Sequence, residues 1–159
     1  MRSLAHHTRQ FLRLSWRHKL GLAQAMLAMP VIALLMRVMG YRRAKNLLHR
    51  LSAGAPQNPS ADIANPDVWT TTQLAAFAGK HTPGRPSCLV RSLALWWILR
   101  GQGIASEIRI GVRPAQAGKT GIDAHAWVEL NGQILNDSPA TVSQFAVFDK
   151  MPDLPLNAF

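Results

Sequence analysis

The segment from Ser87 to Arg100 constrains the fold more than any other part of the sequence. Its apolar side chains fall on every face of a helix, and few polar residues interrupt them. Ser87 can cap the first turn, and Gly101 and Gly103 end the helix. A helix without a polar face must be surrounded by other elements. We therefore expect this helix to lie at the centre of the protein.

Strand patterns follow this helix. Between residues 107 and 112, charged residues and glycine alternate with β-branched residues, which is the period of a half-buried strand. Residues 124–130 and 133–137 flank Asn131-Gly132, a pair typical of hairpin turns. These elements predict an α+β fold in which the buried helix packs on an antiparallel sheet.

An excess of positive charge is confined to one end of the sequence. Residues 1–50 hold ten of the 18 Lys and Arg residues and none of the eight Asp and Glu residues. We divide the chain into a basic helical region (residues 1–51), a linker rich in turn-forming residues (52–67) and a core (68–159). The basic region could attract anionic lipid or an acidic peptide, or could be a solvated face. Nucleic acid is not expected as a partner, because the aromatic residues here are too scattered to form a stacking platform.

One uncharged run, residues 20–36, is about as long as the shortest membrane spans. Gln24 and Pro30 interrupt it, and no small-residue cleavage site follows. We therefore predict a kinked helix, or two helices, packed on the rest of the protein, with further helical stretches at 9–22 and 41–51. The single cysteine cannot form an internal disulfide. We expect a cytoplasmic protein, with peripheral membrane contact as an open alternative.

Cys88 is the candidate nucleophile. It lies in the first turn of the buried helix, where unpaired backbone N–H groups and the positive end of the helix dipole stabilise a thiolate. Arg91, one turn later, could support the thiolate, bind substrate or be an ordinary surface residue. The backbone N–H of Cys88 or Leu89 could donate to an oxyanion, with Gln73 or Trp69 as a second donor. Against this hypothesis, a lone cysteine is more often an inert apolar residue.

His125 is the candidate base. It lies within a predicted strand between Ala124 and Ala126, and these small neighbours leave room around its ring. A neutral imidazole can take the proton of a thiol and then give one to a leaving amine. The other histidines lie in the basic region or in a loop rich in Pro and Gly, and the single cysteine has no Cys or His close by in the sequence. We expect neither a metal site nor a cofactor.

Asp137 is our choice for the group that orients the base. In a hairpin with a two-residue turn, Leu130 pairs with Gln133, and His125 and Asp137 then lie on opposite faces. In a three-residue turn with a bulge, Glu129 pairs with Gln133 and His125 lies opposite Asp137. We therefore predict the bulged hairpin. The weaker candidates for the same role are Asp123, Asn136 and Glu129.

Several segments, taken in order, resemble one family. They are Cys88-Leu89-Val90-Arg91-Ser92-Leu93-Ala94-Leu95, Arg100-Gly101-Gln102-Gly103-Ile104, Gly111-Val112-Arg113, Ala124-His125-Ala126-Trp127-Val128-Glu129, Asn131-Gly132 and Asp137. Over residues 68–137 the sequence resembles the transglutaminase-like leader peptidases of lasso-peptide biosynthesis, with a looser match in the apolar, basic N-terminus. The resemblance implies a papain/transglutaminase-like fold and a catalytic triad of Cys88, His125 and Asp137. Arg91 and Trp127 are expected to support this site or to bind substrate.

The resemblance also implies partners. In that family the enzyme removes the leader from a ribosomally made precursor peptide, and a lactam-forming synthetase then closes the ring. A small leader-recognition domain is fused at the N-terminus in some members and separate in others. Residues 1–51 predict helices without the strands that such a domain needs. We therefore expect a stand-alone peptidase whose partner is a separate leader-recognition protein. The long linker at 52–67 departs from the family pattern.

Two other functions remain open. An acyltransferase would use the same three residues but would pass the acyl group to an amine instead of water. A non-catalytic docking adaptor would keep the basic surface and leave Cys88 unreactive and far from His125. Analysis of the products separates the first from a peptidase. Thiol alkylation as a function of pH separates the second.

Overall fold

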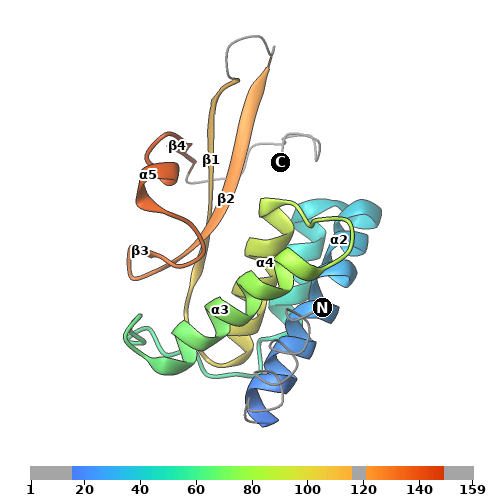
Figure 1. Ribbon diagram of the computed structural model, residues 1–159, viewed down its shortest axis with the longest axis vertical. Helices are drawn as coiled ribbons and strands as arrows, with labels where there is room; N and C mark the ends of the chain where they lie inside the picture. The colour runs from blue at the N-terminus through green and yellow to red at the C-terminus, as the bar shows by residue number, and fades with distance from the viewer. Residues whose placement is uncertain (1–15, 116–120, 149–159) are drawn as a thin grey trace, which may run out of the picture.

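Helices and strands form two layers. The computed structural model describes residues 16–115 and 121–148, in which three long helices lie on one side of a four-stranded sheet (Figure 1). The helices are α2 (Trp16–Leu51), α3 (Pro66–His81), α4 (Cys88–Gly101) and the short α5 (Pro139–Val142). The strands are β1 (Glu107–Pro114), β2 (Ile122–Leu130), β3 (Gln133–Ile134) and β4 (Ala146–Val147), in the spatial order β3-β2-β1-β4. All neighbouring strands are antiparallel, which confirms the predicted α+β class.

The predicted central helix is α4. The Ser87 side chain accepts a hydrogen bond from the Val90 N–H and caps the helix, and nine of its 14 residues are buried. It packs against α2 and α3 on one side and against β2 on the other. One hydrophobic core joins these elements, with Met29 of α2, Leu93 of α4 and Val128 of β2 among its members. The predicted basic region and the predicted core therefore share a single interior.

α2 contains the uncharged run and is kinked. Pro30 lies inside it, and Gly40 takes non-helical angles of φ 76° and ψ 167° that divide it into two helical parts. Its buried side chains belong to the common core, so the predicted packing on the body is confirmed, whereas the break lies at Gly40, beyond the uncharged run. Of the helical stretch predicted at 9–22, residues 9–15 lie outside the described residues.

The connection between α2 and α3 is tied to the rest of the protein. The Asn58 N–H donates to the Gly103 carbonyl at 2.7 Å, just beyond the end of α4. The Asn131 side chain, in the hairpin turn, donates to the Ala61 carbonyl at 2.8 Å. The residues predicted as a linker therefore form a fixed connection between the end of α4 and the hairpin.

The hairpin turn differs from the prediction. Leu130 pairs with Gln133, so the turn has two residues, and the bulged register that paired Glu129 with Gln133 is wrong. Asn131 (φ 51°) and Gly132 (φ 78°) both take positive φ, as a type I′ turn requires. This turn has the twist of the flanking strands and suits an Asn-Gly pair, so no bulge is needed.

The last described residues cover the outer face of the sheet, away from α4. β4 pairs with β1 through Gly111 and Val147. A Cβ added at Gly111 would lie 2.7 Å from the Cβ of Phe145, so glycine is needed for the close approach of this segment. The Arg113 guanidinium lies 4.7 Å from the centroid of the Phe145 ring. The sequence patterns predicted neither α5 nor β4.

Candidate active site

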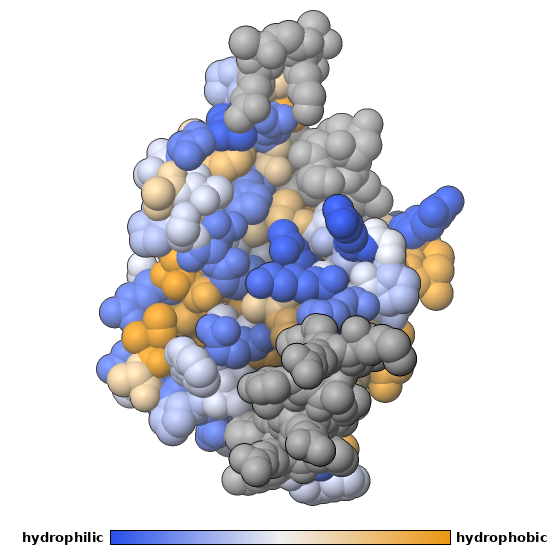
Figure 2. All heavy atoms as spheres, in the orientation of Figure 1, coloured by the Kyte–Doolittle hydropathy of each residue, from blue (hydrophilic) through white to orange (hydrophobic). Residues whose placement is uncertain are grey.

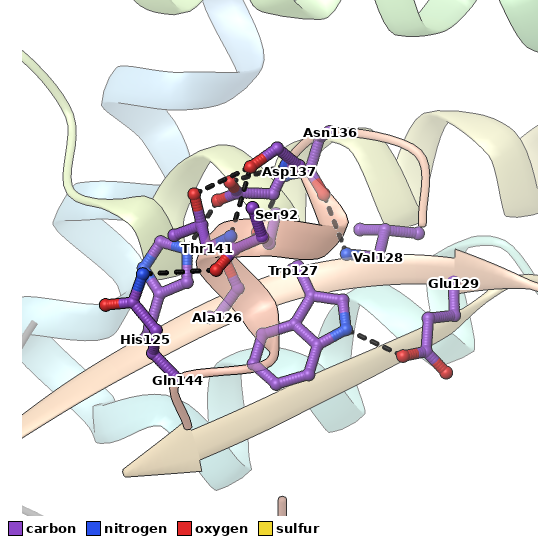
Figure 3. A network of polar contacts seen from close by, with 12 residues as sticks. Ser92, His125, Ala126, Trp127, Val128, Glu129, Asn136, Asp137, Thr141 and Gln144 are labelled. Carbon is purple, nitrogen blue, oxygen red and sulfur yellow. Dashed lines mark hydrogen bonds and ion pairs between the residues drawn. The ribbon is translucent and has the colours of Figure 1, made fainter. Parts of the chain in front are cut away.

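His125 and Asp137 are in direct contact. The Nε2 atom of His125 and the Oδ2 atom of Asp137 are 2.5 Å apart, and their side chains are 16% and 21% exposed (Figure 3). His125 lies on β2, on the face opposite the helices, whereas Asp137 lies in the loop between β3 and α5. The contact expected from the bulged register therefore exists in a hairpin that has the other register.

The early end of β3 explains this contact. The Leu135 N–H still donates to the Val128 carbonyl at 2.9 Å, and the Val128 N–H then donates to the Asn136 side chain at 2.8 Å. The Asn136 side chain thus takes the place of the next backbone group in the ladder, and the main chain turns away. The alternation of side chains between the two faces of a sheet applies only to residues that are paired in the strand ladder. Asp137 has left the ladder, so its carboxylate can reach His125.

The Asp137 carboxylate is also held from its other side. Its Oδ1 atom accepts from the Ser138 N–H at 2.7 Å, and Thr141 of α5 donates a side-chain hydrogen bond to it. Burial raises the pKa of this carboxyl. The hydrogen bonds from His125, Ser138 and Thr141 lower it by a larger amount, so the pKa is below the ordinary value. Asp137 is therefore an ionised group of fixed orientation.

Cys88 completes a line of three side chains. Burial raises the pKa of its thiol, but a hydrogen bond with His125, a backbone hydrogen bond from Ala126 and the charge of Arg91 together hold that pKa below its ordinary value. The hydrogen bond with Cys88 raises the pKa of His125, and burial lowers it. The hydrogen bond with Asp137 also raises it, so the pKa of His125 lies above the ordinary value. Opposite shifts of the two pKa values favour a thiolate paired with an imidazolium. Because Nε2 of His125 is taken by Asp137, Nδ1 is the ring nitrogen left for the thiol.

The edge of β2 brings the thiol within reach of His125. Beyond the end of β3, the Ala126 carbonyl accepts from the Ser92 hydroxyl at 2.9 Å, and the Ala126 N–H bonds to the sulfur of Cys88. Ser92 lies one helical turn after Cys88 on α4 and is fully buried. Two α4 side chains thus replace β3 as partners of β2. The sulfur lies at the edge of the strand, where a side chain on the outer face can reach it.

Sequence reasoning did not assign a role to Ser92. Its hydroxyl also accepts from the Asn136 amide at 3.0 Å, so it joins α4, β2 and the loop that carries Asp137. A signal for this role was present, because Ser92 is a polar residue in an almost wholly apolar helix, four positions after Cys88. Asn136, considered only as a rival of Asp137, forms hydrogen bonds with Val128 and Ser92 and thereby holds the loop that carries Asp137.

Trp127 stacks on His125, the candidate base. Its side chain is fully buried, its indole N–H donates to Glu129 at 2.7 Å, and its ring lies 6.1 Å from the His125 ring, centroid to centroid. Phe145 stacks on His125 at 5.1 Å. Of the two roles expected for Trp127, its burial fits support and not substrate contact.

Arg91 is exposed, and its aliphatic stem crosses α3 at Gly79. A Cβ at Gly79 would lie 2.8 Å from the Arg91 Cδ, so the glycine makes room for the stem. The guanidinium acts on Cys88 only through its charge. The Arg91 side chain is therefore exposed to solvent and lies near enough to Cys88 for its charge to act on the thiol.

Two backbone N–H groups at the start of α4 are candidate oxyanion donors. The Val90 N–H is bonded to the Ser87 side chain at 3.4 Å and the Arg91 N–H to the Ser87 carbonyl at 3.0 Å. The N–H groups of Cys88 and Leu89 have no acceptor within the described part of the chain, as is usual for the first turn of a helix.

The suggested second donors, Gln73 and Trp69, lie elsewhere. Between them on α3, Thr71 donates to Gln102, at the far end of a helix that is about 20 Å long. Trp69 is 62% exposed to solvent. We therefore exclude both residues from the site.

Among residues 16–115 and 121–148, no cluster of three His, Cys, Asp or Glu side chains could hold a metal ion. The polar groups around Cys88 instead form a network in which acids, bases and backbone donors satisfy one another. Such a network suits nucleophilic attack on a carbonyl group followed by proton transfer.

The comparisons with known proteins agree with this geometry. No curated protein and no solved structure matches the chain. The family model of the transglutaminase-like superfamily matches residues 26–149, which include most of α2 and every element of the site. Helices packed on a curled antiparallel sheet, with the site at their junction, are the papain-like arrangement expected from the resemblance. The chain therefore belongs to the transglutaminase-like superfamily.

Proposed function

We propose that the protein is a cysteine peptidase that removes the leader from a ribosomally made lasso-peptide precursor. Cys88 is the nucleophile, His125 the base and Asp137 the group that orients it. The observation that carries this proposal is the continuous line of hydrogen bonds from the thiol through the imidazole to the carboxylate. The order and spacing of the sequence motifs around Cys88 and His125 support the precursor class.

In the first half of the reaction, the Cys88 thiolate attacks the carbonyl carbon at the junction of leader and core. The oxygen gains negative charge and is stabilised by the N–H groups of Cys88 and Leu89. The His125 imidazolium gives its proton to the nitrogen of the leaving amine, and the carbon–nitrogen bond breaks. The leader then remains as a thioester on Cys88, and the core peptide leaves with a free amine.

In the second half, neutral His125 takes a proton from water as the water oxygen attacks the thioester. The tetrahedral intermediate expels the thiolate and releases the leader as a carboxylic acid, which ionises. Asp137 keeps Nδ1 of the ring directed at the reacting atoms and stabilises the imidazolium in both halves.

A separate leader-recognition protein is the expected partner, and a lactam-forming synthetase would close the ring of the released core. The described part of the N-terminal region, residues 16–51, is helical on both sides of Gly40 and contains no strand. Arg91, exposed beside the nucleophile, is our candidate for substrate contact.

The test is incubation of the full chain with a synthetic lasso precursor, with and without a candidate leader-recognition protein, followed by mass spectrometry. We expect two fragments whose masses sum to that of the precursor plus one water. Cys88→Ala should abolish cleavage, whereas Gln133→Ala, at an exposed position of the hairpin, should not. Unimpaired cleavage by Cys88→Ala would falsify the proposal.

Acyl transfer to an amine is the second candidate, because the superfamily model does not separate hydrolysis from transfer and the same three residues serve both. A primary amine added to the same assay distinguishes them, since transfer yields a leader fragment heavier by the amine and lighter by one water. The docking-adaptor alternative required Cys88 to be far from His125. The hydrogen bond between the two side chains argues against it.

A further inference from the structure

We propose that the outward face of α2 binds the surface of an anionic membrane, with the helix lying flat in the interface. This face carries five exposed apolar side chains, which we call the apolar stripe. Their exposed fractions lie between 52% and 73%, and they are Leu20, Leu27, Val31, Leu34 and Val38. The proposal concerns a surface remote from the catalytic residues and does not depend on the reaction proposed for them.

The spacing of the stripe makes it continuous. Its members follow one another by seven, four, three and four positions, and in a helix of 3.6 residues per turn such spacings fall on one line. The opposite face of the same helix is buried in the core, with Leu22, Met29 and Ile32 among its members. α2 is therefore apolar on two sides, and only one of them has a partner within the described structure. Exposed apolar patches of this kind mark interaction surfaces.

The buried face decides how α2 meets a bilayer. By length and composition, Lys19–Leu51 could cross a membrane, but one third of its most apolar window is buried inside the protein. Crossing would remove that face from α3 and α4 and expose the core. Lying parallel to the surface keeps the core intact and buries only the stripe in the lipid.

Charge identifies the kind of lipid. The first 61 residues contain ten Lys and Arg and no acid, and Arg37, Arg42 and Arg43 near the end of the stripe are all exposed. Cations beside an apolar helix face are the pattern that binds anionic lipid headgroups. A second copy of the chain would bring an equally basic surface against the first, so like-charge repulsion disfavours self-association.

The stripe and the candidate site lie on different sides of the molecule. α2 packs on the side of α4 that faces away from the sheet, and the site lies where α4 meets the sheet (Figure 1). In Figure 2, apolar side chains reach the surface at the right margin, where Figure 1 shows α2. A protein bound through the stripe would keep Cys88 open to a peptide from the aqueous side.

Sedimentation of the full chain with lipid vesicles tests the proposal. We expect binding to phosphatidylcholine vesicles that contain about one third phosphatidylserine and little binding to phosphatidylcholine alone. The triple variant Leu27→Gln, Val31→Gln, Leu34→Gln should lose at least about tenfold in affinity, because three side chains no longer enter the lipid. The matched control is Trp69→Gln with Phe77→Gln, two exposed apolar residues of α3, and it should bind like the parent.

A second pair of variants tests the charge. Arg42→Gln and Arg43→Gln should each weaken binding about fivefold, whereas Lys80→Gln, an exposed cation on α3, should not. Circular dichroism checks that every variant is folded. Equal binding by the triple variant, or equal binding to neutral vesicles, would overturn the proposal. So would light scattering that shows a dimer lost in the triple variant, because the stripe would then serve a second copy.

Discussion

Asn136 donates a hydrogen bond to Ser92 at 3.0 Å, across 44 positions of the sequence. The Ser92 hydroxyl in turn donates to the Ala126 carbonyl, and the side-chain oxygen Oδ1 of Asn136 accepts from the Val128 N–H. These two side chains complete the edge of β2 at the point where β3 has ended. Because Asp137 follows Asn136 directly, they also fix where the carboxylate begins its approach to His125. We therefore regard both as positioning residues for the proposed triad.

Asn136→Ala should weaken both the fold and the proposed activity. The substitution leaves the partly buried Val128 N–H without an acceptor, which costs about 1–3 kcal/mol of unfolding free energy. It also frees the loop that holds Asp137, so kcat should fall while KM stays near its parent value, because Asn136 touches no substrate. Denaturant unfolding and steady-state kinetics measure the two effects. The exposed Gln133→Ala serves as control and should change stability by less than about 0.5 kcal/mol.

Ser92→Ala should produce a similar loss, and the two losses should not add. Each single substitution removes the hydrogen bond between Ser92 and Asn136 and leaves the other side chain without its partner. The double variant loses that bond only once, so the coupling energy between the substitutions should be about 0.5–3 kcal/mol. Ser92→Cys, which keeps a weak donor in place, should recover part of the activity. Strictly additive effects in unfolding and in kcat would contradict a shared positioning role.

The reactivity of Cys88 should reveal its partners. The pKa of its thiol lies below the ordinary value, so the midpoint of alkylation by iodoacetamide should lie at a lower pH than for a free cysteine. His125→Ala removes the hydrogen bond and the positive charge that lower this pKa, so the midpoint should move up towards the ordinary value. Asp137→Asn removes the negative charge that stabilises the His125 imidazolium, so the midpoint should lie between those of the parent and His125→Ala. One midpoint shared by the parent and both variants would rule out a coupled pair.

The sequence predicted the central features of this site because they depend on local patterns. The apolar run after Ser87 identified a buried helix that begins at Cys88, the proposed nucleophile, and the alternating pattern around His125 identified β2. Cap preference and side-chain period act over a few residues, so a single sequence reveals them.

The hairpin could not be predicted in the same way. Asn131-Gly132 specified a type I′ turn, but the inference that His125 and Asp137 must then diverge assumed that β3 continues to residue 137. β3 ends at Ile134 because Asn136 and Ser92 supply the next partners of β2, and this depends on a contact across 44 positions. β4 likewise depends on the space left by Gly111, which becomes apparent only when Phe145 is seen against it. Contacts between distant segments leave no periodic mark in the sequence.

The stability of the protein in acid should depend on Asp137. The pKa of this carboxyl is lowered on folding, so the carboxylate stabilises the fold at pH values above its unfolded-state pKa of about 3.9. That contribution disappears as the pH falls through the lower folded-state pKa. Asp137→Asn should therefore be less stable than the parent at neutral pH, and its unfolding free energy should decline less steeply below about pH 5. Parallel declines of parent and variant would show that Asp137 has the same pKa in both states.

Two glycines with equally short contacts should respond differently to alanine. A Cβ at Gly79 would lie 2.8 Å from the Cδ of Arg91, and one at Gly111 would lie 2.7 Å from the Cβ of Phe145. The Arg91 stem is long, flexible and partly solvated, so it can move aside, and alanine also favours the helix by about 1 kcal/mol over glycine. Gly79→Ala should therefore leave the unfolding free energy nearly unchanged or raise it.

At Gly111 the atoms that an added methyl group would contact cannot move aside in the same way. The Phe145 Cβ is fixed by its own backbone, and the Ala146 carbonyl lies 3.2 Å from the added methyl group, so the strand segment itself must move. We expect a loss of about 1–3 kcal/mol, as for other overpacked sites. Because Phe145 stacks on His125, the variant should also change the pH midpoint of Cys88 alkylation, whereas Gly79→Ala should not. Equal stability and equal midpoints for the two variants would mean that β4 and Phe145 do not hold the base in place.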